Sequence, residues 1–188
     1  MRKIIAALQL SVDGLIEGPA GELDWIGSWD DGFGLMPRID TCLLGGGMYP
    51  GYEQYWNAVL ADPGSAAPAE LAYARFAAVT AHLVLSTRMG QPAWPNTRVV
   101  RDLAAIRALK QQPGRDMHAL GGAAFVSSLL EDGLVDELCL LIHPLILGRG
   151  KPLFQGLAGR HGLRLLEARP LAGGLLRLSY ALEQGPAA

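Results

Sequence analysis

Short apolar runs bounded by glycine, aspartate or serine recur along the first two thirds of the chain. They cover residues 3–10, 41–44, 82–86 and 116–120. None of these runs alternates with polar residues, which is typical of strands buried on both faces of a parallel sheet. The pattern therefore predicts a mostly parallel sheet whose strands are connected by helices.

Helical spacing is found between these runs. Apolar residues recur every three or four positions in 103–110 and in 122–131, and the second stretch ends at Gly133, a suitable residue to follow a helix. An alanine-rich stretch at 70–79 predicts a further helix. The segment 58–69 contains two prolines, a glycine and a serine, and predicts a surface loop.

The C-terminal third has a different pattern. Residues 135–147 form a long strand-like run broken at Pro144, and in 175–182 leucine and tyrosine alternate with arginine, serine and alanine. Such alternation predicts a half-exposed antiparallel strand. The predicted fold class is α/β: a three-layer αβα domain with a mixed sheet that is mostly parallel and has an antiparallel C-terminal portion. A length of 188 residues fits a single domain, 1–188.

Composition excludes several classes of protein. Half of the residues are hydrophobic, 18% are charged and the formal net charge is −2, so the chain has no basic reserve for nucleic acid. No apolar stretch is long enough to span a membrane, and the N-terminal run ends at Gln9, which favours a core strand over a secretory signal. Cys42 and Cys139 lie in apolar runs, which predicts buried free thiols in the reducing cytoplasm. A disulfide between them stays an alternative.

The chain lacks the signatures of several common sites. A dinucleotide fingerprint beginning at Gly45 fails because its third glycine is replaced by Pro50. Gly150 and Lys151 lack the rest of a P-loop, and no serine lies in a nucleophile elbow. The four histidines are scattered without metal-ligand spacing, so no metal site is expected.

Glycine-bearing segments follow three of the expected strands, at residues 43–47, 83–88 and 120–124. In open α/β sheets, ligands bind beyond the carboxyl ends of the strands. Small residues let backbone N–H groups approach a phosphate, and a helix N-terminus attracts the anion. Three such segments predict an extended phosphorylated cofactor. The alternative is that each segment is a tight turn that needs glycine for its backbone.

An acidic and aromatic cluster follows the first strand, with Asp13, Glu22, Asp24 and Trp25 as its main members. A carboxylate can bind the amide and amino edge of a flat heterocycle while an indole stacks on its face. Burial would raise the pKa of such a carboxyl group and let it donate a proton. The alternative is that Asp13 and Glu22 lie in solvated turns and that Trp25 anchors the core.

An ordered set of segments now resembles the dihydrofolate-reductase-like superfamily, and most closely stand-alone proteins similar to the C-terminal reductase domain of the bifunctional riboflavin-biosynthesis deaminase-reductase. The segments lie at residues 4–8, 11–16, 21–25, 43–45, 85–86, 120–122, 134–138, 143–144 and 147–154. The resemblance extends from about Met1 to Tyr180. We expect the last segment, 147–154, to be a structural loop between two C-terminal strands.

The resemblance implies an NADPH-binding protein, often a homodimer. By matched position, Ala7 and Ile16 lie near the nicotinamide, and Gly45, Gly46, Gly47 and Met48 cover the pyrophosphate. Ser86, Thr87 and Arg88 face the adenosine ribose and its 2′-phosphate, whereas Leu120, Gly121, Gly122, Ala123 and Ala124 form a second phosphate-binding turn. The forked donors of an arginine suit a phosphate.

Two departures from the family pattern stand out. Family members usually carry an arginine where this chain has Gly46, and a threonine or serine where it has Met48. Loss of a charge-assisted contact would weaken cofactor binding by about 1.5–3 kcal/mol. The acidic residue that dihydrofolate reductases carry on their first helix has three candidates here, Asp30, Asp31 and Asp40.

The resulting hypothesis is an NADPH-dependent reductase that passes a hydride to a C=N or C=O bond of a pteridine- or pyrimidine-like substrate. The implied relatives include dihydrofolate reductase and 5-amino-6-(5-phosphoribosylamino)uracil reductase. Asp13 and Asp24 are the expected catalytic carboxylates, and Trp25 and Glu22 are the expected substrate contacts. Two alternatives stay open: a ligand-binding or dimeric interaction module without turnover, and a promiscuous reductase of carbonyl or nitro compounds.

Overall fold

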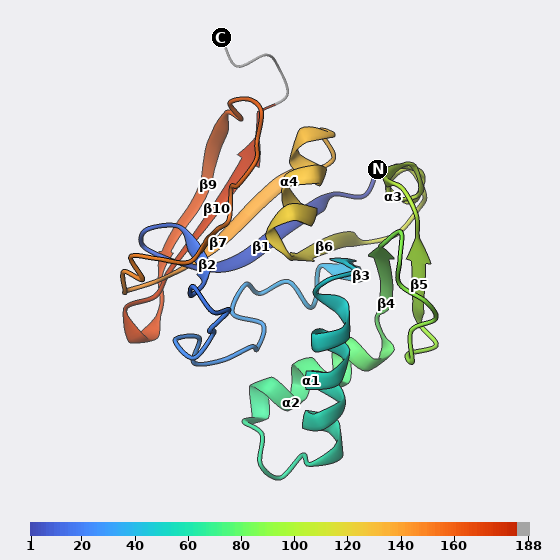
Figure 1. Ribbon diagram of the computed structural model, residues 1–188, viewed down its shortest axis with the longest axis horizontal. Coiled ribbons are helices and arrows are strands. Elements are labelled where there is room, and N and C mark those ends of the chain that lie inside the picture. Colours follow the sequence, from blue (N-terminus) through green and yellow to red (C-terminus); the bar gives the residue numbers. More distant parts are fainter. Residues whose placement is uncertain (184–188) are drawn as a thin grey trace.

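A mixed sheet of eight strands forms the centre of the protein (Figure 1), which a computed structural model describes for residues 1–183. The strand order is β5-β4-β3-β6-β1-β7-β10-β9. The strands are β1 (Ile4–Ser11), β3 (Ile39–Gly45), β4 (Ala81–Leu85), β5 (Thr97–Val100), β6 (Asp116–Gly121), β7 (Glu137–His143), β9 (Leu163–Pro170) and β10 (Leu176–Leu182). From β5 to β7 all neighbours are parallel, whereas β10 and β9 are antiparallel additions. The predicted mixed sheet is confirmed.

Helices cover both faces of the sheet. On one face lie α1 (Tyr49–Ala61) and α2 (Pro68–Val79), and on the other lie α3 (Leu103–Lys110) and α4 (Ala123–Glu131). Strand β1 shows the division, because Ile4 and Ala6 belong to the core under α3 and α4, whereas Ile5 and Ala7 belong to the core under α1 and α2. The predicted three layers are therefore confirmed. Within residues 1–183, every helix is too short or too polar to cross a lipid bilayer.

Several segments differ from the sequence pattern, among them strand β5, which none of the apolar runs predicted. Helix α1 was not expected. It includes the start of the predicted loop 58–69 and α2 includes its end, so that only residues 62–67 connect the two helices. A proline in its first turn and the buried side chains of Tyr49, Tyr52 and Trp56 account for α1. The predicted run 135–147 is a strand only over Glu137–His143, because Pro144 cannot extend the ladder. The exposed edge strand β9 carries no buried face from which to predict it.

Two short elements complete the fold. Strands β2 (Leu15–Glu17) and β8 (Lys151–Pro152) pair with each other, and a single 3₁₀ turn, η1 (Ala172–Gly174), connects β9 to β10. The pairing of β2 with β8 places the segment expected as a structural loop, 147–154, beside the loop after β1. Asp13 and Leu147 illustrate this contact, since the Asp13 carboxylate accepts a hydrogen bond from the Leu147 amide at 3.1 Å.

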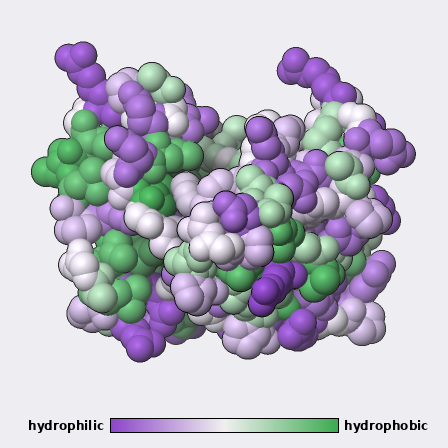
Figure 2. Space-filling model, turned by 90° about the horizontal axis from the view of Figure 1, so that it is seen from below, coloured by the Kyte–Doolittle hydropathy of each residue, from purple (hydrophilic) through white to green (hydrophobic). Residues whose placement is uncertain are grey.

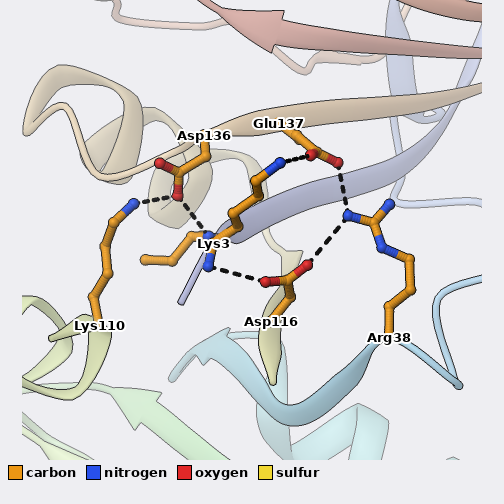
Figure 3. A network of polar contacts seen from close by, with 7 residues as sticks. Lys3, Arg38, Lys110, Asp116, Asp136 and Glu137 are labelled. Atoms are coloured by element: carbon orange, nitrogen blue, oxygen red, sulfur yellow. Dashed lines mark hydrogen bonds and ion pairs between the residues drawn. The ribbon is translucent and has the colours of Figure 1, made fainter. Parts of the chain in front are cut away.

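A network of charged side chains joins the amino ends of four strands (Figure 3). Lys3 donates to Glu137 at 2.7 Å, and Arg38 donates to Glu137 at 3.0 Å and to Asp116 at 3.2 Å. Burial disfavours the charge on Glu137, but the hydrogen bonds from Lys3 and Arg38 outweigh it and leave its pKa lowered. The network therefore fixes the starts of β1, β3, β6 and β7 relative to one another.

A buried lysine extends this network. Lys110, at the end of α3, is 5% exposed; its Nζ donates to the Leu134 carbonyl oxygen at 2.8 Å and forms an ion pair with Asp136. Asp136 also accepts a hydrogen bond from the Ile4 amide at 2.7 Å. The buried charge thus has a carboxylate and a carbonyl oxygen as acceptors, which offset the cost of burying a cation.

The C-terminal hairpin leaves an apolar face uncovered. Leu165 lies opposite Tyr180, and Leu163 lies opposite Leu182, on the face where Leu178 and Leu182 pack against the α3–α4 core. Every residue of β9 is exposed and every residue of β10 is half-buried. Figure 2 shows hydrophobic residues gathered on the left, the side on which β9 and β10 lie in Figure 1.

Candidate active site

A cavity of about 850 Å³ opens at the carboxyl ends of β1, β3, β4 and β6. The loop between β2 and β3, helix α1 and the first turn of α4 enclose it. Its lining is mostly apolar, and it is large enough for a dinucleotide with a small substrate. It is therefore the candidate active site. Within residues 1–183 no cluster of side chains is suited to hold a metal ion.

Most of the expected cofactor-binding residues meet in this cavity. The lining includes Ala7, Ile16, Gly45, Gly46, Gly47, Met48, Leu120, Gly122, Ala123 and Ala124. Gly121 lies directly behind them, with φ of +130° and with Met48 Sδ 3.3 Å from the place where its Cβ would be. We call this set, with Gly121, the glycine wall. Ser86, Thr87 and Arg88 are not part of the lining.

Close packing explains why glycine is present at two of these positions. A Cβ on Gly45 would lie 3.0 Å from Phe125 Cβ, and a Cβ on Gly46 would overlap the side chain of Ser86. The Gly46 amide also donates to the Leu85 carbonyl oxygen at 2.9 Å. The arginine that the family resemblance implies after Gly45 therefore has no room, because Ser86 occupies its path.

The first turn of α4 offers free donors to the cavity. Gly122 is its N-cap and supplies no side chain, and the first amides to bond within the helix are those of Phe125 and Val126, both to the Gly122 carbonyl oxygen. The amides of Ala123 and Ala124 have no acceptor in the part of the chain that the structure describes. A helix start with free N–H groups attracts anions such as phosphate.

The segment with Ser86 lies beside the glycine wall. Ser86 Oγ accepts hydrogen bonds from the amides of Arg88 at 3.3 Å and Met89 at 3.0 Å. Arg101 Nη1 donates to the Ser86 carbonyl oxygen at 2.6 Å and fixes the turn from the side of β5. Arg88 itself is exposed. Its amide donates to Ser86 Oγ, and the Ser86 side chain lies against Gly46. Arg101 was not singled out in the sequence because its role depends on this loop closing onto it.

The expected catalytic carboxylates lie outside the cavity. The Asp13 carboxylate accepts from the Leu147 and Gly148 amides at 3.1 and 2.8 Å. Hydrogen bonds from Ser11 and from these amides lower the pKa of Asp13, the opposite direction from the one expected for a proton donor. Asp24 is exposed on the loop before β3. Both residues therefore belong to the rim of the fold rather than to the cavity lining.

The two expected substrate contacts also face elsewhere. The Glu22 carboxylate accepts from the Ala20 amide at 2.8 Å and closes a tight turn. The Trp25 indole stands edge-on to the His143 ring, with 5.0 Å between the ring centroids, and its buried Nε1 has no partner within the described residues. The structure thus supports the turn for Glu22 and packing against β7 for Trp25.

Two other carboxylates line the cavity, Asp30 and Glu17. Glu17 pairs with Lys151 at 3.0 Å, whereas no side chain in residues 1–183 pairs with Asp30. Of the other candidates for the acidic position, Asp31 accepts from two amides of the next turn, and Asp40 pairs with Arg2 at the amino ends of the strands. Only Asp30 among the three is part of the cavity lining.

Aromatic side chains form the remaining wall, which sequence reasoning missed together with helix α1. They are Trp29, Phe33, Tyr52, Tyr55, Trp56 and Tyr73. Tyr52 and Trp56 pack edge to face at 74° with 6.1 Å between ring centroids, and the Trp56 and Tyr73 centroids are 4.8 Å apart with the rings tilted by 41°. The spacing of Tyr49, Tyr52 and Trp56 is a helical signal that could have identified this wall.

His118 completes this side of the cavity. Its ring is 2% exposed, and its Nε2 lies 3.3 Å from the Ala7 carbonyl oxygen, which can only accept a hydrogen bond. Nε2 therefore carries the proton, and Nδ1 is an acceptor that has no partner within the described residues. Burial lowers the pKa of His118 to about 4, so the ring is neutral near pH 7.

The same architecture occurs in proteins of known structure. A putative riboflavin biosynthesis protein from Shewanella sp. PV-4 superimposes with a TM-score of 0.74 at 22% identity, covering 97% of this chain and 99% of that one. Dihydrofolate reductase from Enterococcus faecalis, complexed with NADP(H) and RAB-propyl, superimposes with a TM-score of 0.62 at 13% identity, covering 97% of each chain. These likenesses establish the dihydrofolate-reductase-like fold.

Sequence relatives narrow the assignment. The uncharacterized protein YyaP of Bacillus subtilis (strain 168) is 32% identical over 185 residues, which cover 95% of this chain and 94% of that protein. The family model described as the RibD C-terminal domain matches residues 2–176, from the first strand into β10. The chain therefore belongs to the RibD C-terminal domain family.

Proposed function

We propose that this protein is an NADPH-dependent reductase that transfers a hydride to a C=N or C=O bond of a pteridine- or pyrimidine-like heterocycle. One observation carries the proposal: a single cavity is lined both by a glycine wall with free helix-start amides and by aromatic rings and a carboxylate, Asp30, that is unpaired within the described residues. The glycines and amides suit a dinucleotide pyrophosphate, and the carboxylate with the aromatic rings suits a polar heterocycle. Membership of a family of reductase domains supports the same reading.

The residues present fit the cofactor. The Ala123 and Ala124 amides would receive the pyrophosphate, the glycines at 45–47 leave room for its close approach, and Arg88 would meet the 2′-phosphate. Bound NADPH supplies the hydride. Ala7 and Ile16 would shape the space beside the nicotinamide and exclude water from it.

We place the orienting carboxylate at Asp30 rather than at Asp13 or Asp24. Asp30 lines the cavity and is unpaired within the described residues, whereas Asp13 is held by loop amides and Asp24 is exposed. Asp30 can accept hydrogen bonds from the N–H edge of the substrate and hold its reacting bond beside the nicotinamide. Either Asp30 or a water that it binds would deliver the proton that completes the reduction.

A titration with NADPH and with NADH tests the proposal. Trp29 lies in the cavity, so bound nucleotide should quench tryptophan fluorescence. We expect saturable NADPH binding at micromolar concentration, at least tenfold tighter than NADH binding, and a loss of that preference in Arg88→Ala. Binding without oxidation of NADPH by any heterocycle would favour the non-catalytic module. Turnover of small carbonyl or nitro compounds alone would favour the promiscuous reductase.

Two further expectations belong with this proposal. The uncovered apolar face of β9 and β10, with Leu163, Leu165 and Tyr180, would be buried in a homodimer. Sedimentation should then give twice the chain mass for the wild type and the chain mass for Leu165→Glu, whereas a wild-type monomer would refute the dimer. The two cysteines are buried free thiols, which suits the reducing cytoplasm.

A further inference from the structure

A glutamine lines the cavity near the end of β1. Gln9 lies on the same face of the strand as Ile5 and Ala7, because side chains two residues apart in a strand point to the same side. It is half-buried, so part of its side chain is accessible from the cavity. A primary amide carries two donor hydrogens and an acceptor oxygen, and the proposed function gives those of Gln9 no role.

Two neighbours fix the orientation of the Gln9 amide. Its Nε2 donates to the Ser28 carbonyl oxygen at 3.2 Å, and its Oε1 lies 2.7 Å from His143 Nε2. A carbonyl oxygen can only accept a hydrogen bond, so the nitrogen end of the amide faces Ser28 and the oxygen end faces His143. His143 Nε2 therefore carries a proton and donates to Gln9 Oε1.

The protein holds the oxygen end of this amide more deeply than the nitrogen end. His143 ends β7 and is 6% exposed, and the Trp25 indole stands edge-on to its ring with 5.0 Å between the centroids. The hydrogen bond between His143 and Gln9 is partly buried, whereas the hydrogen bond from Gln9 to Ser28 is exposed. The nitrogen end of the amide is therefore the one that reaches the accessible surface.

One N–H group of Gln9 is left over. Nε2 has two hydrogens, the Ser28 carbonyl oxygen accepts one of them, and no second acceptor for Nε2 lies among the described residues. The amide thus offers a hydrogen-bond donor to a ligand. A carbonyl oxygen would accept this hydrogen bond, whereas an amino group in the same place would set donor against donor and leave both unsatisfied.

Ser28 connects Gln9 to the side of the cavity that the proposed function assigns to the substrate. Ser28 Oγ accepts a hydrogen bond from the Asp30 amide at 3.2 Å, and Trp29, between them in the chain, lines the cavity. The free amides assigned to the pyrophosphate belong instead to the first turn of α4. Gln9 is therefore placed to meet the substrate.

From these contacts we infer that Gln9 is a specificity-determining residue whose free N–H group donates to a carbonyl oxygen on the substrate ring. His143 and Ser28 are positioning residues that hold the amide in the orientation required. The inference rests on the proposed function and narrows it to heterocycles that carry an oxo group at this position.

Rings that differ only in oxo and amino groups test the inference with NADPH bound. One pair is pterin and 2,4-diaminopteridine, and the other is 5,6-diaminouracil and 2,4,5,6-tetraaminopyrimidine, each titrated at pH 7.5 by tryptophan fluorescence. In Gln9→Leu we expect at least one oxo ring to bind at least tenfold more weakly, while its amino counterpart changes less than threefold. Equal losses within each pair, no loss for either oxo ring, or no binding of either oxo ring to the wild type at millimolar concentration would overturn the inference.

Gln9→Glu is a second variant of the same size, and it replaces the free N–H group with an acceptor. It should lower the affinity for the oxo ring and raise that for the amino ring, and a wild-type ratio between the two would refute the contact. Gln112→Leu is the matched control, because Gln112 is exposed beyond the end of α3, and it should leave all affinities unchanged.

The cofactor provides a further check on where Gln9 acts. NADPH affinity in Gln9→Leu should stay within twofold of the wild type. A tenfold fall in NADPH affinity with the wild-type ratio between oxo and amino rings would place Gln9 against the nicotinamide carboxamide and overturn the inference.

His143→Phe tests the positioning role, because it keeps an aromatic ring beside Trp25 and removes the donor to Gln9 Oε1. The amide can then turn and offer either end to the ligand, so the ratio of oxo-ring to amino-ring affinity should fall at least fivefold. A purely structural role would lower both affinities together and keep the ratio, which would refute the positioning of Gln9 by His143.

The two proposals fail separately. Absence of NADPH binding refutes the reductase, whereas equal losses for oxo and amino rings in Gln9→Leu, measured with NADPH bound, refute only the role of Gln9.

Discussion

The two ends of the central sheet differ in whether their polar groups have partners. At the amino ends, Lys3, Arg38, Lys110 and their carboxylate partners satisfy one another across four strands (Figure 3). At the carboxyl ends, glycines bring backbone close together, and donors at the start of α4 and the Asp30 carboxylate have no partner within residues 1–183. Saturated polar groups hold a fold together, whereas unsatisfied ones in a cavity are available to a ligand.

The comparison predicts that changes at the amino ends affect stability alone and that changes at the carboxyl ends affect binding. The largest expected exception is acidification, because buried histidines lie on both sides of this comparison. His82 is the second residue of β4, and His118 lines the cavity; burial lowers the pKa of each to about 4. Their unfolded pKa is about 6.5.

Between pH 6.5 and 4 the unfolded chain therefore binds more protons than the folded chain. The free energy of unfolding should be fully developed above pH 6.5 and should fall as the pH drops toward 4, by roughly 3 kcal/mol for each histidine. Urea unfolding at pH 7, 6, 5 and 4 measures this loss. A folded His82→Phe variant should show a smaller loss than the wild type, and a flat wild-type profile would contradict the burial of neutral histidines.

Lys110→Met is expected to have the next largest effect. It removes the cation and leaves the Asp136 carboxylate and the Leu134 carbonyl oxygen without that donor. Breaking a buried pair in this way lowers the free energy of unfolding by about 3 kcal/mol. NADPH affinity of the folded variant should not change, since Lys110 lies at the other end of the sheet. If Lys110→Met lowered the NADPH affinity but not the free energy of unfolding, the contrast between the two ends of the sheet would be wrong.

Gly46→Ala should have a smaller effect on stability and a distinct effect on binding. Its methyl group would overlap Ser86, so we expect a loss of about 1–3 kcal/mol in unfolding free energy. NADPH affinity should fall at least tenfold as the wall shifts. Gly47→Ala is the matched control for stability, because nothing lies within 4 Å of its Cβ position. Equal stability of the two variants would refute the tight packing of Gly46.

Local signals predicted much of this molecule from the sequence. The buried parallel strands, the helices at 103–110 and 122–131 and most of the glycine wall follow from patterns within ten residues. The substrate side does not, because it depends on the path of the loop before β3. That path turns Asp30 into the cavity while amides of the segment after β7 hold Asp13. Which of several nearby carboxylates meets a cavity is decided by such distant contacts.

Helix α1 and strand β9 were missed for different reasons. The prolines, glycine and serine of 58–69 predict a loop, whereas the helical signal of α1 is the spacing of the aromatic residues just before it. In strand β9 the alternation begins with Leu163 and Leu165 and breaks at Leu166, where the pairing with β10 also shifts register, so no regular pattern predicts the strand. Its partner β10, which is half-buried, was predicted from its regular alternation.

The most direct test of the central claim places a charge at the start of α4. Ala124 is exposed, lines the cavity and lies in the first turn, where a carboxylate favours the helix. Ala124→Asp should therefore keep or raise the melting temperature while weakening NADPH binding at least tenfold relative to Ala124→Asn, measured by the same fluorescence titration. Equal NADPH affinity in the two variants would contradict the account, because the pyrophosphate would then lie somewhere else.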